Sequence, residues 1–312
     1  MVAALDIGGT KVHGAIVDSQ GNILKQMREP VAVGHGPDAF FKQLIQMLTE
    51  LTRDHKITKV GIGCAGPLDG QSGDLLDPTN FFTDGKSWGR LSLLKPLQQH
   101  FSTWKFFLDN DAAAAVLGEK WLGGTATDNL AVMTLGTGVG IGVLVDGKLV
   151  RTRQGLHPET SHIPLNYADQ NFPCGCGNFG CIEAYLAGSH VLQRLAKAWQ
   201  KQYLDGEQLL ALLNAQDPRA LSAMSEYGEW LAQSIHALAV LFGPEQISLT
   251  GGFATTAPWF LPVVEKRLPQ LLARRRVGVD FLPKVHVSRL GDNLSVLGAA
   301  RVGYLYSESK ER

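Results

Sequence analysis

An internal repeat constrains the fold of this chain more than any other feature of its sequence. Residues 5–18 (LDIGGTKVHGAIVD) align without gaps with residues 133–146 (MTLGTGVGIGVLVD), and in this alignment Gly14 falls on Gly142. Each copy is followed by a short turn and another apolar run. Each copy therefore predicts a β-hairpin with a glycine-rich tip. The duplication predicts a fold built from two similar halves.

The tips of the two predicted hairpins suggest a phosphate-binding site. Gly8 and Gly136 occupy equivalent positions at these tips. Glycine permits positive φ angles and lets backbone N–H groups come close to a ligand, so two copies could hold a polyphosphate between them. The alternative is that each glycine-rich hairpin only turns the chain. The presence of two matching copies favours the phosphate clamp.

Helical and strand patterns alternate along the rest of the chain. In residues 37–52, apolar residues recur at helical spacing behind a Gly-Pro-Asp start. Further helices are expected over residues 91–100, 111–121 and 218–242 and from about residue 294, and strands over residues 57–64, 104–109 and 246–249. Residues 152–182 resemble a loop. The alternation predicts an α/β architecture.

Length and composition argue against several classes of protein. A chain of 312 residues exceeds the size at which a single hydrophobic core usually stops growing, so two lobes are expected. The 29 basic residues balance the 29 acidic residues, which gives no electrostatic reason to expect nucleic acid or an anionic membrane as a partner. The sequence has neither an apolar run of about eighteen residues nor a secretion signal at its start. We therefore expect a cytoplasmic protein.

Asp6 stands at the end of the first predicted strand, just before the glycine turn and the hydroxyl group of Thr10. A phosphate bound at this turn would bring magnesium with it, and magnesium prefers hard oxygen ligands such as a carboxylate with intervening waters. Asp6 is therefore the candidate magnesium ligand. The alternative is an aspartate that only forms the turn.

A second acidic position, Asn110-Asp111, lies where a predicted strand ends and an alanine-rich helix begins. Either residue could be the N-cap of this helix, because aspartate and asparagine are both preferred there. However, the strand ends of α/β sheets face the ligand crevice. Asp111 is therefore a candidate for the chemistry as well as for the cap.

Three of the four cysteines lie close together in the loop-like stretch. Cys174, Cys176 and Cys181, with His162 upstream, have the ligand types and number of a closed tetrahedral zinc site. Such a site has no open position, so its expected role is structural. A redox role is the alternative, although the strand and helix setting of a thioredoxin-like motif is missing. Cys64 stands alone in an apolar run, which predicts a buried thiol.

Taken together, these motifs resemble the ROK family (repressors, open reading frames and kinases). The resemblance covers nearly the whole chain. It rests on residues 6–11, 61–69, 110–111 and 135–142, on the cysteine cluster, and on residues 251–252 and 291–293.

The resemblance implies the duplicated ribonuclease-H-like fold of the actin-like ATPases, an α/β fold with two lobes around a central cleft. Residues 1–118 together with residues 295–312 would form a small N-terminal lobe. Residues 119–294 would form a large lobe with the zinc-binding loop. The two lobes are expected to close on the substrate.

The implied activity is that of an ATP-dependent hexose kinase, which transfers the γ-phosphate of ATP to the 6-hydroxyl group of a sugar. Glucose is the first choice of acceptor, an N-acetylated hexosamine (N-acetylglucosamine or N-acetylmannosamine) is the second, and fructose and mannose follow. The implied cofactors are ATP, Mg²⁺ and a structural Zn²⁺. The implied partners are small molecules, with neither nucleic acid nor membrane among them, and a homodimer is expected.

The resemblance also implies roles for individual residues. Asp111 would be the general base. The sugar would be bound by Asn80, Asn110, Asp111, Glu159, His162 and Glu183. ATP and its magnesium ion would be bound by Asp6, Gly8, Gly9, Thr10, Lys11, Gly136, Thr137, Gly138 and Gly252. The zinc ligands would be His162, Cys174, Cys176 and Cys181.

The chain departs from the family pattern in the sugar motif. Ser161 replaces the glycine of the family's Glu-x-Gly-His motif, and Pro158 precedes Glu159 where the family usually has glycine. The spacing between His162 and Cys174 is also slightly longer than in the family. These changes bear on sugar preference and zinc geometry, and they leave the phosphate and base residues untouched.

Two other functions remain as alternatives. The first is a sugar-responsive regulator, because some family members join this body to an N-terminal helix-turn-helix. Here the first phosphate motif already begins at Asp6, and the balanced charge does not favour DNA binding. The second is a sugar-sensing protein without catalysis, which would have no need for Asp6, Asp111 and both hairpins.

Overall fold

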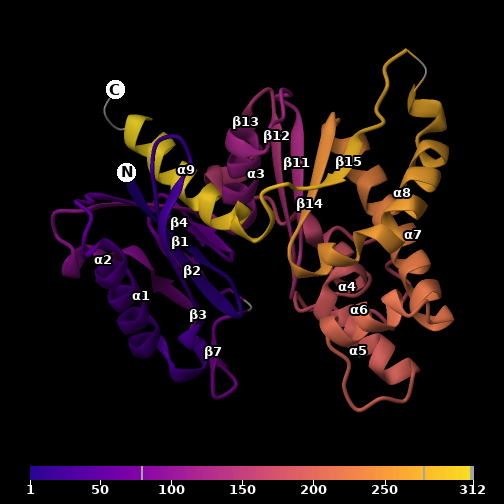
Figure 1. Cartoon of the computed structure of the whole chain (residues 1–312), viewed down its shortest axis with the longest axis horizontal. Helices are drawn as coiled ribbons and strands as arrows, with labels where there is room; N and C mark the ends of the chain where they lie inside the picture. The colour runs from indigo at the N-terminus through magenta and orange to yellow at the C-terminus, as the bar shows by residue number, and fades with distance from the viewer. Residues whose placement is uncertain (79, 277, 310–312) are drawn as a thin grey trace. The chain divides into compact units, whose positions relative to one another are not determined.

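The structure, a computed structural model, describes residues 1–78, 80–276 and 278–309. The chain divides into two compact units. The first unit comprises Met1–Ala126, Leu149–Pro158 and Asn293–Arg312. The second unit comprises Thr127–Lys148 and Glu159–Asp292. Each unit contains a five-stranded mixed sheet with helices (Figure 1).

The sheet of the first unit has the strand order β10-β4-β1-β2-β3. β1 pairs antiparallel with β2, which pairs antiparallel with β3, and the line β1-β4-β10 is parallel. The strands are β1 (Val2–Ile7), β2 (Lys11–Val17), β3 (Ile23–Pro30), β4 (Lys59–Cys64) and β10 (Lys105–Asn110). Short strands form two smaller sheets: β5 (Leu68–Asp69), β6 (Asp74–Leu76), β7 (Phe82–Thr83), β8 (Lys86–Ser87) and β9 (Arg90–Ser92).

The second unit repeats this arrangement with the order β13-β12-β11-β14-β15. β11 pairs antiparallel with β12, while β11, β14 and β15 run parallel. The strands are β11 (Leu130–Leu135), β12 (Val139–Val145), β13 (Lys148–Leu149), β14 (Gln246–Thr250) and β15 (Lys284–Val287). Counted from its other edge, the order β15-β14-β11-β12-β13 corresponds to β10-β4-β1-β2-β3, and β15, β14, β11 and β12 run in the same directions as their counterparts. This agreement confirms the duplication that the sequence repeat predicted.

The two hairpins differ by one residue, which the gapless alignment could not reveal. In the first hairpin Ile7 pairs with Val12, so residues 8–11 form the connection. In the second, Leu135 pairs with Val139, so only residues 136–138 do. Gly14 and Gly142 are each the fourth residue of their strands, β2 and β12, as the alignment predicts, but their partners across the hairpin differ. Gly14 pairs with Leu5, whereas Gly142 pairs with Val132 and not with Met133, the residue aligned with Leu5.

The predicted helices are present, but α2 begins at Leu94 and not at residue 91, because Arg90–Ser92 pair with β6 as strand β9. α1 (Pro37–Thr52) has the predicted bounds, and its apolar side chains at helical spacing are buried against the sheet of the first unit. The others are α2 (Leu94–His100), α3 (Asp111–Leu122), α4 (Ile182–Leu186), α5 (Gly188–Ala198), α6 (Gly206–Asn214), α7 (Pro218–Phe242), α8 (Ala257–Leu271) and α9 (Leu294–Ser309). Within the described residues, none of these helices has the length and apolarity needed to cross a bilayer.

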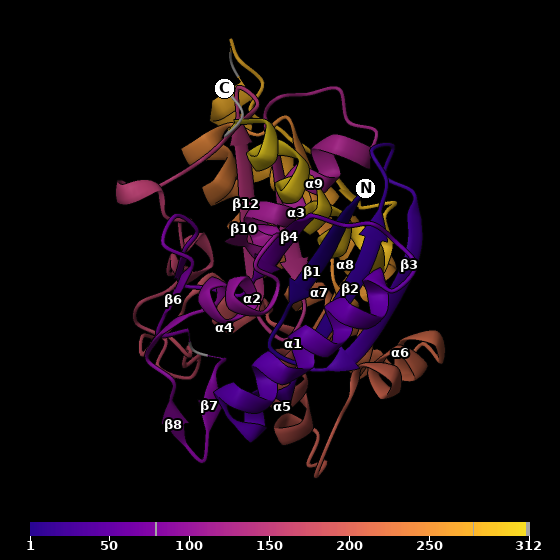
Figure 2. The same ribbon diagram turned by 90° about the vertical axis from the view of Figure 1, so that its left-hand side faces the viewer.

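Helices cover both faces of the first sheet, with α1 and α2 on one face and α3 and α9 on the other (Figures 1 and 2). The approach of α9 is unusually close. A Cβ atom on Gly61 of β4 would lie 1.9 Å from the carbonyl oxygen of Ala299 in α9. A Cβ atom on Gly298 of α9 would lie 2.1 Å from the carbonyl oxygen of Ala114 in α3. Only glycine allows this contact, which holds α3 and α9 directly against the sheet.

We expect Gly298→Ala to destabilise the first unit strongly. Its methyl group would meet a backbone oxygen that cannot move without shifting α3, so the loss should be at least about 2 kcal/mol, in the upper range for overpacking. Urea unfolding measures the loss. Gly206→Ala is the matched control, since Gly206 begins α6 with open space around it, and alanine there should be neutral or stabilising. Equal stability of both variants and the wild type would contradict the packing described.

Candidate active site

The carboxyl ends of three parallel strands meet at one edge of the first sheet. Ile7 of β1, Cys64 of β4 and Asn110 of β10 lie side by side in register. One residue earlier, Asp6 and Asp109 flank Gly63. Because neighbours in a parallel register point to the same face, Asp6 and Asp109 lie on the face covered by α3 and α9. The sequence motifs around Asp6 and Asn110 are thus brought to the same edge.

Asn110, and not Asp111, is the N-cap of α3. Its Oδ1 accepts hydrogen bonds from the amides of Ala112 (2.9 Å) and Ala113 (3.3 Å), and its backbone is extended. Asp111 is therefore the first residue of the helix. A Cβ atom on Gly63 would lie 3.6 Å from the Cα of Asp111, so the start of α3 packs directly on β4. The half-buried Asp111 does not have to cap the helix and can serve chemistry.

Asp6 lies within electrostatic reach of Asp111. Burial and the negative charge of Asp111 together raise the pKa of Asp6 to about 7, against the opposing charges of Lys11 and Arg28. Two neighbouring carboxylates in a partly buried place favour a bound cation, because a cation offsets their repulsion. Asp6 is thus suited to hold magnesium, directly or through water.

The expected sugar ligand Asn80 lies against the first glycine-rich hairpin. A Cβ atom on Gly9 would lie 3.2 Å from the Cγ of Asn80, so the asparagine side chain occupies the space that glycine leaves. Phe81, the next residue, is fully buried and packs edge-on against Phe40 and Trp88 at centroid distances of 5.5 and 5.3 Å. This aromatic anchor fixes the position of Asn80. Thr79, which precedes it in the motif, lies outside the described residues.

The turn of the first hairpin is exposed at its tip. The amide of Gly8 donates to the carbonyl oxygen of Lys11 (3.0 Å), and the carbonyl oxygen of Thr10 accepts from Val31 (3.1 Å). The side chains of Thr10 and Lys11 are exposed. The hydroxyl and ammonium groups are therefore available to an anion at this turn.

In the second hairpin the carbonyl groups of the turn are engaged within the protein. The oxygens of Gly136, Thr137 and Gly138 accept from the amide of Gly188 (2.8 Å), the hydroxyl group of Ser189 and the amide of Gly136 (3.0 Å) respectively. Thr137 and Gly138 are exposed. A phosphate at this turn would therefore meet amide groups rather than carbonyl oxygens, as a glycine-rich anion site requires.

Glu183 connects the second hairpin to the cysteine cluster. Its Oε2 accepts a hydrogen bond from the amide of Val139 (3.1 Å), and its Oε1 lies 3.7 Å from the Sγ of Cys174. A Cβ atom on Gly138 would lie only 2.8 Å from Oε2. Glycine at this position is therefore needed for Glu183 to lie where it does. This contact parallels that of Asn80 with Gly9 in the first unit.

Four residues with zinc-binding side chains come together in the second unit. The ligand atoms of His162, Cys174, Cys176 and Cys181 all lie within 4.8 Å of one another. The Sγ of Cys174 lies 3.4 Å from the Nδ1 of His162, and the Sγ atoms of Cys176 and Cys181 are 3.7 Å apart. Zn–S bonds of about 2.3 Å in a tetrahedron separate two sulfur atoms by about 3.8 Å. The four side chains therefore fit a zinc ion, in spite of the long spacing between His162 and Cys174.

The remaining expected ligands of the second unit lie in loops. Gly252 follows β14 and begins a short 3-10 helix, with open space where a side chain would be. Glu159 is exposed and precedes the 3-10 turn Thr160–His162. Ser161, which replaces the family glycine, is 5% exposed. Each unit therefore contributes both phosphate-hairpin residues and expected sugar ligands.

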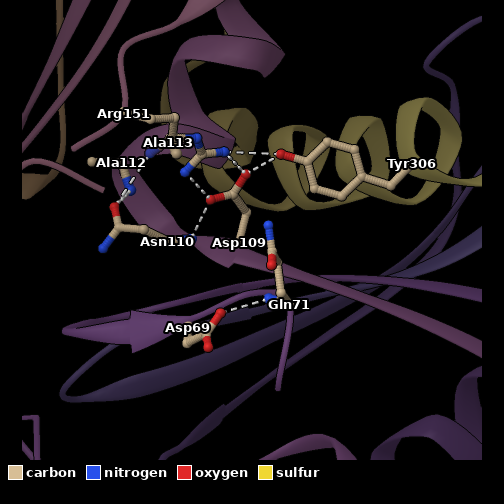
Figure 3. Close-up of polar contacts among 8 residues, drawn as sticks. All are labelled: Asp69, Gln71, Asp109, Asn110, Ala112, Ala113, Arg151 and Tyr306. Atoms are coloured by element: carbon tan, nitrogen blue, oxygen red, sulfur yellow. Dashed lines mark hydrogen bonds and ion pairs between the residues drawn. The ribbon is translucent and has the colours of Figure 1, made fainter. Parts of the chain in front are cut away.

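Sequence reasoning missed a charged cluster next to the candidate base. Asp109 is 3% exposed and forms an ion pair with Arg151 and a hydrogen bond with Tyr306 (Figure 3). A signal was present, because Asp109 is an acidic residue at the end of the otherwise apolar run Phe106–Leu108. Its partners could not be found, since they lie 42 and 197 positions further along the chain.

Comparison with known proteins shows the family of the chain. The sequence pattern of the ROK family matches residues 2–303, and the chain belongs to this family. It is 28% identical to a glucokinase of Thermotoga maritima over 96% of this chain and 95% of the relative. It is 29% identical to an N-acetyl-D-glucosamine kinase of Pectobacterium atrosepticum over 96% of this chain and 98% of the relative.

A solved structure also resembles the chain. The crystal structure of a ROK family glucokinase from Streptomyces griseus, in complex with glucose and AMPPNP, has a TM-score of 0.82 and 26% sequence identity. The match covers 97% of this chain and 99% of that chain. Together with the repeated sheets, this similarity confirms the predicted fold class.

The raised pKa of Asp6 predicts that its charge destabilises the ligand-free protein. The folded protein keeps this proton up to about pH 7, whereas the unfolded chain loses it near pH 4, so stability falls as the pH rises between these values. The rise from 3.8 to about 7 corresponds to at most about 4 kcal/mol. Asp6→Asn removes the titrating group. Its gain in stability over the wild type should therefore grow from about pH 5 to about pH 8.

Urea unfolding at several pH values in this range measures the gain. Asp38→Asn is the control, because Asp38 is exposed in the first turn of α1. A gain for Asp6→Asn that is the same at every pH would show that the carboxyl group titrates normally.

Proposed function

We propose that this protein is an ATP-dependent hexose kinase that transfers the γ-phosphate of ATP to the 6-hydroxyl group of a sugar. The observation that carries the proposal is the pair of matched glycine hairpins in the two sheets, with Asp111 at the strand end beside Asp6. Membership of the ROK family and the similarity to kinases over almost the full length support it.

The two hairpins would bind the phosphates of ATP. Gly9, Thr10 and Lys11 would supply amides, a hydroxyl group and a positive charge, and Thr137 and Gly138 would supply amides. Gly8 and Gly136, whose own amides close the two turns, would shape the site. Gly252 would lie near the other end of the nucleotide. Magnesium, held through Asp6, would neutralise charge on the phosphate oxygens. In phosphoryl transfer the protein mainly has to align the nucleophile and offset this charge.

Asp111 would accept the proton of the attacking hydroxyl group as the bond to phosphorus forms. General base catalysis of this kind contributes roughly 10²- to 10⁴-fold in rate. The carboxylate of Asp111 lies at the first position of α3, where the positive end of the helix dipole offsets negative charge.

The sugar would be held by side chains at the expected sugar-binding positions. Asn80, Glu159, His162 and Glu183 are assigned to its hydroxyl groups. The Oδ1 of Asn110 is occupied by the cap of α3. Asn110 would therefore bind the sugar through its Nδ2 amide group.

Glucose is the preferred acceptor in this proposal, followed by N-acetylglucosamine or N-acetylmannosamine, then mannose and fructose. Measurement of kcat/KM for these five sugars in a coupled ADP-release assay tests the choice. A clear preference for an N-acetylated sugar would replace glucose. Sugar binding without any ADP release would favour the regulator instead.

Asp111→Ala should keep the fold and nearly abolish turnover. The fold survives because Asn110, not Asp111, caps α3. Turnover falls because the proton acceptor is lost, by about 10²-fold or more. The ADP-release assay measures this loss, and Asp38→Ala in the first turn of α1 is the matched control. An Asp111→Ala variant that retains more than about a tenth of the wild-type rate would rule out the assigned role.

The cysteine cluster would bind one structural zinc ion. His162 and Glu183 are then fixed for the sugar, since the first is a ligand and the second lies beside Cys174. Zinc would hold the loop in place and take no part in the chemistry, because its four positions are filled by protein.

Freshly purified protein should therefore contain about one zinc per chain by metal analysis. Cys176→Ser should lose the metal and raise the KM for the sugar by about tenfold or more, because the second unit then no longer fixes His162 and Glu183. Tyr167→Ala is the control, since Tyr167 lies in the same loop with 79% of its surface exposed. Wild-type protein isolated without zinc would remove this part of the proposal.

Two further properties belong to the proposal through the family. The protein is expected to act in the cytoplasm and to form a homodimer, and its lobes, residues 1–118 with 295–312 and residues 119–294, are expected to close on the substrate. Light scattering measures whether the protein is a homodimer in solution. Small-angle scattering with and without sugar and nucleotide tests whether the lobes close.

A further inference from the structure

A buried polar network is centred on Asp109, which lies two residues before the candidate base in the sequence (Figure 3). The carboxylate of Asp109 accepts hydrogen bonds from the Nη1 of Arg151 (2.8 Å) to Oδ1 and from Nη2 to Oδ2. The hydroxyl group of Tyr306 also donates to Oδ2, and it accepts from the Nη2 of Arg151 (2.9 Å). The three side chains thus form a closed triangle. Asp109 is 3% exposed, so the charge is removed from water.

The network joins three segments of the first unit. Asp109 lies in β10, Arg151 in the segment Leu149–Pro158, and Tyr306 in α9. A bidentate pair between arginine and a carboxylate has a fixed geometry as well as a favourable energy. The pKa of Arg151 is raised by its bonds to Asp109, and burial together with the charge of Asp109 raises the pKa of Tyr306. Arg151 thus stays charged and Tyr306 keeps its proton, as the contacts require.

The network continues into the first turn of α3. The Oδ1 of Asp109 accepts a hydrogen bond from the amide of Asn110 (2.8 Å), and the side chain of Asn110 in turn caps the amides of Ala112 and Ala113. Asp111 lies within this chain of hydrogen bonds. A displacement of Asp109 would therefore move the backbone that carries Asp111.

A buried ion pair is not needed for stability alone. Apolar side chains of similar volume often stabilise a fold equally well or better than a buried pair, because the pair has to offset the cost of desolvating both charges. What the apolar replacements cannot do is accept the hydrogen bond from Asn110. This difference separates a positioning role from a purely structural one.

We propose that Asp109, Arg151 and Tyr306 are positioning residues that hold the backbone of Asn110 and Asp111 in the geometry for phosphoryl transfer. The proposal rests on the proposed role of Asp111 as the base. A base displaced by even about 1 Å can cost about 10²-fold in rate. The network acts on turnover, and it leaves the hairpins that bind ATP unchanged.

The test compares an apolar replacement with milder variants. The triple variant Asp109→Leu/Arg151→Met/Tyr306→Phe removes the network without leaving a buried charge. Tyr306→Phe removes a single hydroxyl group and should fold in any case. Arg151→Lys keeps the charge and loses the bidentate geometry. Arg90→Met is the matched control, because Arg90 forms an ion pair with Asp74 at 2.8 Å in the same unit with its own side chain exposed.

Three quantities are measured for each variant. They are the midpoint of urea unfolding, the hydrogen exchange of the amides of residues 110–113 without substrate, and kcat and KM for sugar and ATP. The exchange measurement needs no activity. It therefore decides whether the network holds this turn even if the protein proved not to phosphorylate any sugar.

We expect the triple variant to fold, with its amides at residues 110–113 exchanging about tenfold faster or more and its kcat reduced about tenfold or more, while the KM for ATP stays within about threefold. Tyr306→Phe and Arg151→Lys should lie between it and the wild type, and Arg90→Met should match the wild type. Wild-type exchange in a folded triple variant would overturn the proposal. Faster exchange with unchanged kcat would overturn it too. If the triple variant does not fold, Tyr306→Phe takes its place in the test. Wild-type exchange and wild-type kcat in Tyr306→Phe would then overturn the proposal.

Discussion

The position of α3 depends on backbone contacts that only glycine permits. Gly61 and Gly298 let α9 touch β4 and α3 at the distance of backbone atoms, and a Cβ atom on Gly63 of β4 would lie only 3.1 Å from the Cβ of Ala114 in α3. A helix held by backbone contacts cannot shift in the way that one held by flexible side chains can. Since Asp111 is the first residue of α3, these contacts determine where its carboxylate lies relative to Asp6.

The duplication gives both units a glycine-rich hairpin, and in the structure a polar side chain lies beside each of them. In the first unit Asn80 fills the space beside Gly9, and in the second Glu183 fills the space beside Gly138. Asn80 and Glu183 are both expected sugar ligands. A missing side chain in each hairpin thus brings an expected sugar ligand next to an expected phosphate-binding turn, which is the proximity that the proposed transfer requires. The cysteine cluster extends this arrangement in the second unit, because Cys174 lies beside Glu183.

Much of this could be predicted from the sequence, because the signals were local. The helical spacing in residues 37–52 gave the bounds of α1, and the ligand types of His162 and the three cysteines predicted a cluster that the structure assembles. The extra residue of the first hairpin was missed, since glycine-rich turns offer no side chains by which to align them. The choice between Asn110 and Asp111 as cap needed backbone geometry. The partners of Asp109 could not be predicted from the sequence, because pairing across such long separations leaves no periodic pattern in it.

The central claim is that Asp111 faces the sugar hydroxyl group that attacks ATP. A crystal structure with a non-hydrolysable ATP analogue and glucose tests it most directly. The account predicts a carboxylate oxygen of Asp111 within about 2.6–3.2 Å of the 6-hydroxyl oxygen, and that oxygen about 3–3.5 Å from the γ-phosphorus. The phosphates should contact residues 8–11 and 136–138. A 6-hydroxyl group bound by another carboxylate, with Asp111 out of reach, would contradict it.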